Sequence, residues 1–437
     1  MKVISSPTVD SALAMGVHTL LREGVQEDSR NGPVWVMPEP VSNVYQHPRL
    51  LVLFNEFRDA NPFFHLYEAL WMLAGRNDLA PLARLASNMS NFSVDGKTFN
   101  AAYGHRWRNN GLDQLREVIE KLKKTPNTRQ AVINIWDQDD DLVDGEHNAR
   151  DRACNLSMVF TPRVRDGKKV LDMMVSNRSN DAVWGAYGAN YVHFSMVLIF
   201  VAEASGFDVG QYTQVSANFH MYGEGLYGKK LFNNLVQEHG DHHHVNGQTF
   251  AAIVDQENNS LLGVAQDAYL FQGKMFLEKM FDFSNGVDQT LREIEEFAIG
   301  GLPGEYFDSL AADAAHADAA AFHDPKYIYS SPILHVAHHM MVAWSLRKSG
   351  HPDRALKHLR DFDTDLQASA KNESTCQSEC EGCECPYTYV LGNVEIDLSG
   401  TAKEMISADV LPSLPHSDCG LDWYHAASTW IHRRMPI

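Results

Sequence analysis

The spacing of apolar side chains in the first half of the chain predicts a mixture of helices and strands. Residues 12–24 and 63–75 carry apolar residues at helical spacing, and each run ends at a glycine, a common residue just after a helix. Residues 131–136 and 170–176 are short β-rich runs between turn-forming residues, which is typical of strands. The two kinds of element follow no regular strand–helix–strand alternation. We therefore predict an α+β fold, with helices packed on a mixed β-sheet.

Two further patterns refine this prediction. The pair Asp166-Gly167 separates apolar runs at 156–162 and 170–176, and Asp-Gly in such a place is a strong signal for a β-hairpin. Residues 191–205 are so apolar that the helix they predict must be buried.

The pattern changes after about residue 230. Helical spacing dominates the remainder, at residues 263–281, 287–299, 331–348 and 352–371. We expect a compact first domain at 1–235 and a mostly helical C-terminal region at 236–437, whose role the sequence does not indicate.

Charge and composition narrow the classes of function. The chain has 437 residues with 37 Lys and Arg against 56 Asp and Glu, a net charge of −19, so bulk charge does not favour nucleic acid. Any bound phosphate must therefore lie in a local group of arginines. The longest apolar stretch, 192–204, contains His193 and Glu203 and is too short to span a bilayer of about 30 Å. The first residues do not resemble a signal peptide, and we expect a cytoplasmic protein without membrane contact.

The six cysteines need two separate explanations. Cys154 is alone in the first half, whereas the others lie near the C-terminus at Cys376, Cys380, Cys383, Cys385 and Cys419. A cytosolic chain is not expected to depend on disulfides. The four closely spaced thiols at 376–385 are a candidate structural zinc site, and reduced free thiols are the equal alternative.

Cys154 and Glu68 are the first candidates for chemistry. Cys154 follows Arg152 by two residues, and a neighbouring guanidinium favours the thiolate, which is the nucleophilic form. The alternative is a buried structural cysteine. Glu68 lies within an otherwise apolar helix, where a carboxylate is either at the surface or buried for a function.

Two further polar groups are candidate site residues. Residues 177–181 (NRSND) come directly after an apolar strand, where Arg, Ser and Asp are suited to hold a phosphate or a polar base; an ordinary capped turn is the alternative. His220 and Tyr222 are two residues apart, so in a strand both side chains point to the same side.

Seven segments, taken together and in order, resemble the thymidylate synthases and the phage deoxypyrimidine-monophosphate hydroxymethylases. The resemblance does not extend to residues 236–437. In chain order the segments are LLREGVQEDSRNG with Arg30, HLYEALWMLAG with Glu68, AAYGHRWR with Tyr103, PNTRQAVINIW with Arg129, RACN with Cys154, NRSNDAVWG with Arg178, Ser179 and Asp181, and NFHMY with His220 and Tyr222.

The resemblance implies a reaction on a deoxypyrimidine monophosphate in a homodimer with shared active sites. The phosphate ligands that it implies are Arg30, Arg178, Ser179 and, from the second subunit, Arg129. The thiolate of Cys154 would add to carbon 6 of the base, and carbon 5 would then accept a one-carbon unit from 5,10-methylenetetrahydrofolate.

The resemblance also implies roles for the remaining candidates. Glu68 would organise the water that moves protons, and Asp181 would contact the folate or its water network. Tyr103 would belong to the catalytic group, and His220 and Tyr222 would hold the deoxyribose.

Departures from the synthase pattern indicate which reaction is catalysed. Asn155 follows Cys154 where synthases usually have His, and residues 88–100 lack the Trp that packs near the folate. Both enzyme types form the same exocyclic methylene intermediate, to which a synthase delivers hydride and a hydroxymethylase adds water. Loss of apolar shielding favours water, so we predict a hydroxymethylase, with thymidylate synthase as an alternative.

One side chain after the arginine-serine motif reads the base. In the family Asn suits uracil and Asp suits cytosine, because their donors and acceptors match. The loop after Gly185 is one residue longer than in the family, so a strict count from Gly185 places Ala189 at the position that reads the base. Asn190 fits better, because the following Tyr191 and the buried helix then align with the family. Asn190 predicts deoxyuridine monophosphate (dUMP), with a deoxycytidine monophosphate (dCMP) hydroxymethylase as an alternative.

Two further considerations affect the prediction. Arg129 is followed by Gln130 where the family often has two arginines, which weakens phosphate binding unless another arginine compensates. A nucleotide-binding regulator that lost catalysis is the alternative from another class, and the presence of both Cys154 and Glu68 argues against it.

Overall fold

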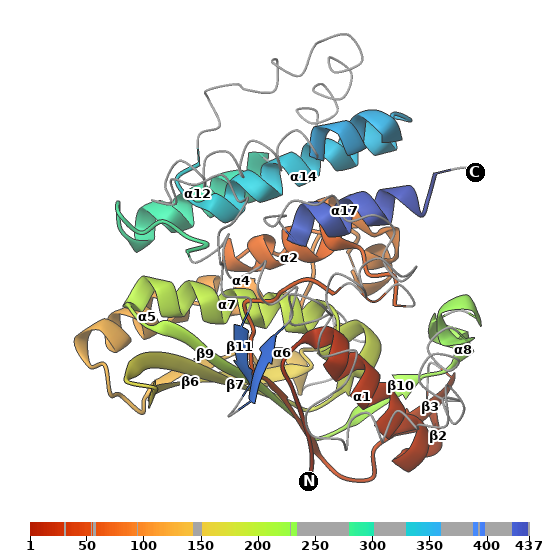
Figure 1. The fold of residues 1–437 in the computed structure, drawn as a ribbon, viewed down its shortest axis with the longest axis horizontal. Helices are drawn as coiled ribbons and strands as arrows, with labels where there is room; N and C mark the ends of the chain where they lie inside the picture. Colours follow the sequence, from red (N-terminus) through yellow and green to blue (C-terminus); the bar gives the residue numbers. More distant parts are fainter. Residues whose placement is uncertain are drawn as a thin grey trace.

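A six-stranded mixed sheet forms the centre of the protein, with helices layered on it (Figure 1). The structure is a computed structural model, and it describes residues 1–29, 32–53, 55, 58–93, 95–142, 151–227, 229–233, 279–300, 329–359, 388–391, 394–397 and 422–435. Sheets and helices are both abundant and are not arranged in repeated βαβ units, so the α+β prediction is confirmed.

The large sheet joins strands from distant parts of the chain. In spatial order it contains β1 (Lys2–Ser6), β4 (Val41–Tyr45), β9 (Asp208–Ser216), β7 (Lys168–Asn177), β6 (Asn155–Arg165) and β5 (Ala131–Asn134). The pairs β1–β4 and β7–β9 are parallel and the others antiparallel. A second sheet has the order β2 (Val25–Ser29), β3 (Gly32–Val36), β10 (Phe219–Tyr222) and β8 (Asn180–Asp181), and β11 (Thr388–Leu391) pairs with β12 (Val394–Asp397).

The predicted hairpin is confirmed and joins β6 to β7. Arg165 pairs with Lys168, so Asp166 and Gly167 form a two-residue turn. Both have positive φ, 51° and 75°, as the tight turns that match strand twist require. The hairpin matters for function because it places the start of β6 beside the end of β7.

The predicted helices of the first half are present, with ends set by capping. Thr8 caps α1 (Val9–Glu23) and Asn61 caps α2 (Pro62–Leu73), each by accepting a backbone N–H with its side chain. The apolar helix is α7 (Ala189–Ser205), which is buried on nearly all sides. The shorter helices are α3 (Ala80–Leu85), η1 (Ser87–Phe92), α4 (Tyr103–Asn109), α5 (Gln114–Lys124), α6 (Gln138–Asp141), η2 (Ala182–Ala186) and α8 (Glu224–Tyr227).

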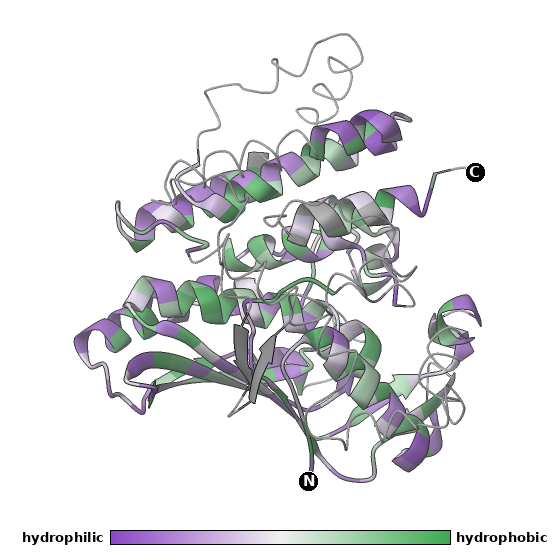
Figure 2. Ribbon diagram, in the orientation of Figure 1, coloured by the Kyte–Doolittle hydropathy of each residue, from purple (hydrophilic) through white to green (hydrophobic). Residues whose placement is uncertain are grey.

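The apolar character of α7 reflects its place in the core. Among the described residues, Ala182–Ser205 is the single helical stretch that passes a length and hydropathy test for membrane spans, and 83% of its most apolar window is buried inside the protein. In Figure 2 α7 is mostly green and lies between the large sheet and the layer that contains α2.

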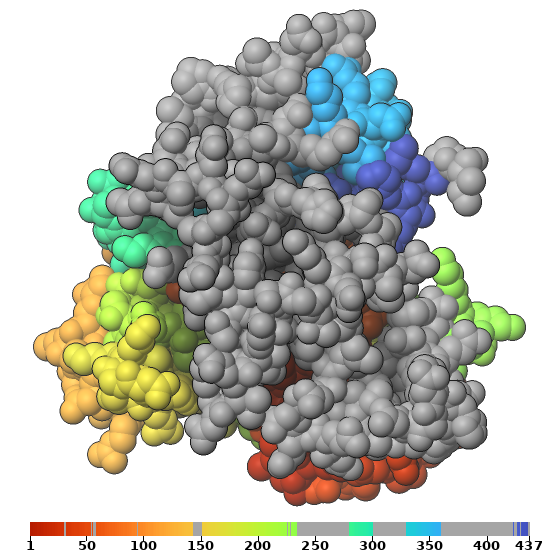
Figure 3. All heavy atoms as spheres, in the orientation of Figure 1, coloured from red at the N-terminus to blue at the C-terminus, as the bar shows by residue number. Residues whose placement is uncertain are grey.

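The described C-terminal helices pack on α2 and extend the same core. They are α12 (Val287–Gly300), α14 (Pro332–Lys348) and α17 (Asp422–His432), of which the sequence predicted the first two. The hydroxyl of Tyr67 donates to the Ala298 carbonyl at 2.9 Å, and the Phe63 ring contacts Trp344 and Trp430. Figure 3 shows α14 and α17 at the opposite end of the molecule from the N-terminal strand.

Parts of the predicted C-terminal pattern lie outside the described residues. Of 263–281 only 279–281 are described, and they are not helical; of 352–371 the described residues 352–359 are helical. The clustered cysteines at 376–385, and Cys419, lie outside the described residues.

Candidate active site

The predicted nucleophile lies where β6 begins, directly beside the end of β7. Asn155 pairs with Asn177, so Cys154 and Arg178 are neighbours across the hairpin. A guanidinium nitrogen of Arg178 (Nη2) lies 3.8 Å from the sulfur of Cys154, and Nε donates to the Ala153 carbonyl at 2.8 Å. A positive charge at this distance favours the thiolate over the neutral thiol. The structure thus brings these two predicted residues together.

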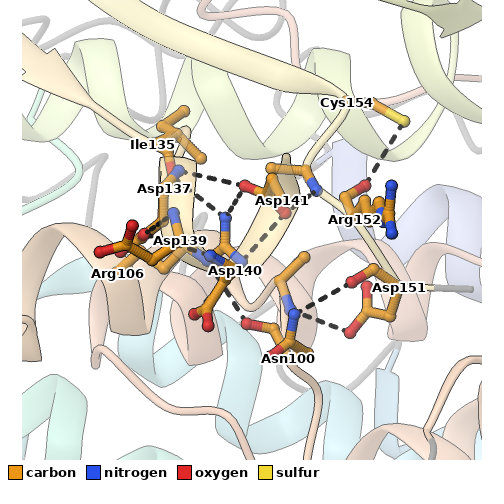
Figure 4. A network of polar contacts seen from close by, with 12 residues as sticks. Asn100, Arg106, Ile135, Asp137, Asp139, Asp140, Asp141, Asp151, Arg152 and Cys154 are labelled. Carbon is orange, nitrogen blue, oxygen red and sulfur yellow. Dashed lines mark hydrogen bonds and ion pairs between the residues drawn. The ribbon is translucent and has the colours of Figure 1, made fainter. Parts of the chain in front are cut away.

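A buried ion pair holds the same segment from the other side (Figure 4). The Ala153 amide donates to Oδ1 of Asp141 at 3.0 Å, and Asp141 in turn pairs with Arg106. The Asp141 side chain is fully buried and that of Arg106 is 6% exposed. Asp151 accepts the Ala101 amide at 2.9 Å, which fastens the chain before Cys154 to the start of α4. This network was not predicted from the sequence.

Tyr103, the first residue of α4, lies next to the thiol. Its ring stacks on Phe194 with centroids 6.1 Å apart. Burial and the charge of the neighbouring Cys154 raise the pKa of Tyr103, so the phenol stays protonated beside the thiolate.

The Glu68 carboxylate is mostly withdrawn from solvent and lies beside a histidine that was not predicted from the sequence. Its Oε2 lies 3.0 Å from Nε2 of His193 on α7, and the two side chains are 12% and 4% exposed. Neither of these two atoms makes an aligned hydrogen bond to a described residue. Glu68 therefore does not lie on the open surface, and its function stays a prediction. A single histidine within an apolar run was the available signal for His193.

Asn190 lies in the first turn of α7, after a widened turn. The amide of Tyr187 donates to the Ala182 carbonyl five residues earlier, so residues 182–186 form a π-turn that holds one residue more than an α-turn. The side-chain nitrogen of Asn190 donates to Oδ1 of Asn180 at 3.3 Å, whereas Ala189 has no polar side chain.

Asp181 and His220 meet across β8 and β10. Their backbones pair directly, and the rings of His220 and Tyr222 lie 4.9 Å apart, so both point to one side as predicted. Burial lowers the pKa of His220, which favours its neutral form. Oδ1 of Asp181 accepts from the π-turn and from the Tyr227 hydroxyl at 2.7 Å, while Oδ2 is buried without a hydrogen-bond partner among the described residues.

Other predicted residues lie away from this group or outside the described chain. Ser179 follows Arg178 and is half-buried. Arg129 is exposed at a surface hollow of about 630 Å³ beside α5. Since Ala131 pairs with Phe160 in an antiparallel register, Arg129 lies level with Pro162 in the far half of β6, roughly 25 Å along the strand from Cys154. Arg30 lies outside the described residues. Within the part of the chain that the structure describes, no group of three metal-binding side chains occurs.

Comparisons with known proteins identify the relatives of this chain. A family model described as "Thymidylate synthase" matches residues 58–258. A deoxyuridylate hydroxymethyltransferase of Pseudomonas phage M6 is 51% identical over 227 residues, which is 52% of this chain and 63% of that protein. One from Bacillus phage SP01 is 36% identical over 300 residues, 65% of this chain and 68% of that protein.

A solved structure is also similar. The thymidylate synthase of T4 phage matches with a TM-score of 0.38 and 19% identity, over 48% of this chain and 75% of that chain. Together, the family match and the identity to the SP01 protein over two thirds of its length establish the relationship. The chain belongs to the family of the thymidylate synthases and the phage deoxyuridylate hydroxymethyltransferases.

Proposed function

We propose that the protein hydroxymethylates carbon 5 of dUMP, using methylenetetrahydrofolate as the one-carbon donor. The observation that carries the proposal is the position of Cys154. Its sulfur lies 3.8 Å from Nη2 of Arg178, and the neighbouring Tyr103 hydroxyl stays protonated because its pKa is raised. Its support comes from two relatives named deoxyuridylate hydroxymethyltransferase, at 51% and 36% identity. The matches span about two thirds of each relative's length, so activity and substrate are taken from them as a proposal.

The residues divide the chemistry among them. The thiolate of Cys154 adds to carbon 6 of the base, and Arg178 balances its charge before the addition. Tyr103 keeps a protonated hydroxyl beside the thiolate, where it is available as a hydrogen-bond donor. Glu68, paired with His193, takes the proton from the water that adds to the one-carbon unit. Arg178 and Ser179 lie at the end of β7, where the nucleotide phosphate binds in this proposal.

The folate site is proposed at Asp181. When bound, methylenetetrahydrofolate supplies the one-carbon unit. Its pterin ring carries N–H donors, and Oδ2 of Asp181 is a buried acceptor that has no hydrogen-bond partner among the described residues. Oδ1 cannot serve, since the π-turn amides and Tyr227 already occupy it.

A homodimer with shared active sites completes the proposal. An apolar row crosses the outer face of the large sheet, since Val132 pairs with Val159, and Val159 with Met174. Directly paired residues point to the same side of a sheet, and Val132 and Met174 are 40% and 39% exposed. A two-fold partner on this face covers the row. It also gives Arg129, which is too far from Cys154 of its own chain, a second chain to reach.

Product analysis tests the proposal. The protein is incubated with methylenetetrahydrofolate and either dUMP or dCMP, and nucleotide mass and folate oxidation state are read. We expect 5-hydroxymethyl-dUMP and tetrahydrofolate. Release of dihydrofolate with a methylated product would show hydride transfer and identify a thymidylate synthase instead. A preference for dCMP would identify a dCMP hydroxymethylase.

A further inference from the structure

Three side-chain amides and one hydroxyl form a continuous chain of hydrogen bonds, in which all members are buried except the half-buried Asn190 at its end. The nitrogen of Asn190 donates to Oδ1 of Asn180 at 3.3 Å, and the nitrogen of Asn180 donates to Oε1 of Gln214 at 2.7 Å. The nitrogen of Gln214 then donates to the Tyr212 hydroxyl at 2.7 Å. Asn180, Gln214 and Tyr212 are 2%, 0% and 0% exposed, so water does not compete for these bonds.

The direction of an amide decides which pyrimidine it reads. An asparagine can present its oxygen to the ring N–H of uracil and its N–H to the neighbouring carbonyl oxygen. Rotated by half a turn, the same side chain presents its N–H to the bare ring nitrogen of cytosine and its oxygen to the amino group. An asparagine that is free to rotate therefore does not distinguish the two bases by its hydrogen bonds.

This chain of hydrogen bonds holds the Asn190 amide in one orientation. If Asn190 rotated alone, its oxygen would face Oδ1 of Asn180, and two acceptors would meet where a hydrogen bond had been. Asn180 cannot compensate alone, because its nitrogen donates both to Gln214 and to Ser216, the latter at 3.1 Å. Reversal requires all three amides to rotate together in the buried interior.

A glycine makes the contact between Asn180 and Asn190 sterically feasible. A Cβ atom on Gly185 would lie 2.6 Å from Oδ1 of Asn180 and 3.0 Å from the nitrogen of Asn190. Such distances are shorter than van der Waals contact allows, so a side chain here would push the two amides apart. Gly185 belongs to the π-turn at Ala182–Ala186.

We propose that Asn180 and Gln214 are specificity-determining residues, which orient the Asn190 amide so that the site accepts uracil and rejects cytosine. The inference rests on the proposed function, in which Asn190 contacts the base. The fixed orientation explains why an amide that could hydrogen-bond to either uracil or cytosine binds uracil selectively.

The test is the ratio of kcat/KM for dUMP to kcat/KM for dCMP. We expect Asn180→Ala to lower this ratio by about tenfold or more, because the hydrogen bond that orients Asn190 is lost. Gly185→Ala and Gln214→Leu should lower it in the same direction, the second by less because Asn180 keeps its contact with Asn190. The ratio of dissociation constants for the two nucleotides, measured without folate, should follow the same order.

Asn177→Ala is the matched control. Asn177 is also 2% exposed and donates to Ser216 at 3.4 Å, but the structure shows no hydrogen bond from it to Asn190. It should cost similar folding stability and leave the ratio unchanged.

The outcomes separate the two proposals. One outcome is that wild-type protein forms 5-hydroxymethyl-dUMP while the folded Asn180, Gly185 and Gln214 variants keep the wild-type ratio. In that case the proposed role of the hydrogen-bond chain in specificity is wrong and the proposed function stands. If the wild-type protein prefers dCMP, both are wrong. If it methylates dUMP, the proposed function fails, whereas a lowered ratio in the variants still supports the chain. Should Asn180→Ala not fold, Gly185→Ala and Gln214→Leu decide the question.

Discussion

Cys154 is the residue on which the proposed chemistry depends. Cys154→Ser should abolish turnover, because a serine hydroxyl at neutral pH is far less nucleophilic than a thiolate. Nucleotide binding should persist, since the proposed phosphate ligands Arg178 and Ser179 are untouched. Calorimetric titration with dUMP, alongside the product assay, checks both parts. Substantial activity in this variant would exclude covalent catalysis by Cys154.

The contact between Glu68 and His193 gives a second prediction at this scale. His193→Phe keeps an aromatic ring in the core but leaves the carboxylate without its 3.0 Å partner. We expect kcat to fall by about tenfold or more, with little change in KM for dUMP, because the pair handles water rather than the nucleotide.

Ser195→Ala is the control for that variant. Ser195 lies two residues farther along α7, is fully buried, and is not part of the proposed proton transfer. Steady-state kinetics of both variants separate the two explanations. Equal losses would point to altered packing of α7 and not to the Glu68–His193 contact.

The residues that the sequence could predict lie in short motifs, some beside strand ends and others, such as that of Glu68, within helices. Cys154, Arg178 and Asp181 were identified in this way, and the hairpin brings the first two together. His193 and Gln214 could not be assigned, because their roles depend on which distant element packs against them. No local pattern shows that α7 lies on α2, or that Gln214 on β9 contacts Asn180 on β8.

At the scale of elements, periodicity identified the long helices and the hairpin but not the irregular segments. The π-turn at Ala182–Ala186 was not predicted from the sequence. The short helix α6 appeared only as an acidic run, yet its last residue, Asp141, holds the amide before the nucleophile. Such segments are stabilised by tertiary contacts and show little hydrophobic periodicity, which is the pattern that predicts helices and strands from sequence.

The Asp141–Arg106 pair joins α6 to α4 and is predicted to be important for stability. Asp141→Ala leaves the Arg106 guanidinium buried at 6% exposure without its carboxylate. Removing one partner of a buried pair costs about 3–5 kcal/mol, and we expect a loss of that order in chemical unfolding. The double variant Arg106→Met with Asp141→Leu should recover part of this loss. If Asp141→Ala has the same midpoint denaturant concentration of unfolding as the wild-type protein, the pair does not stabilise the segment.

At the scale of the whole molecule, the C-terminal helices raise the question of whether residues 1–235 fold alone. Phe63 and Tyr67 on α2 are fully buried, and their described neighbours include Trp344, Trp430 and the Ala298 carbonyl. Deleting 236–437 exposes these rings, at about 1.5–3 kcal/mol for each large apolar side chain. We expect an insoluble or poorly cooperative fragment, assessed by thermal unfolding.

Tyr67→Phe in the full chain is the control for the deletion. It removes only the hydrogen bond to Ala298 and should cost about 1 kcal/mol. A soluble fragment of 1–235 that unfolds cooperatively would show an independent domain and contradict the expectation.

The proposed dimer makes a prediction that depends on two chains at once. Arg129 lies roughly 25 Å along β6 from its own Cys154, so it can serve a thiol only if a partner presents one across the sheet face. Cys154→Ser and Arg129→Ala subunits should each have little activity alone. In a heterodimer of the two, one site carries both changes and the other carries neither. Equal mixing therefore restores about a quarter of wild-type activity, since half of the dimers are heterodimers with one intact site. Native mass spectrometry establishes that heterodimers have formed, and in such a preparation an absence of recovered activity would show that Arg129 acts within its own subunit or not at all.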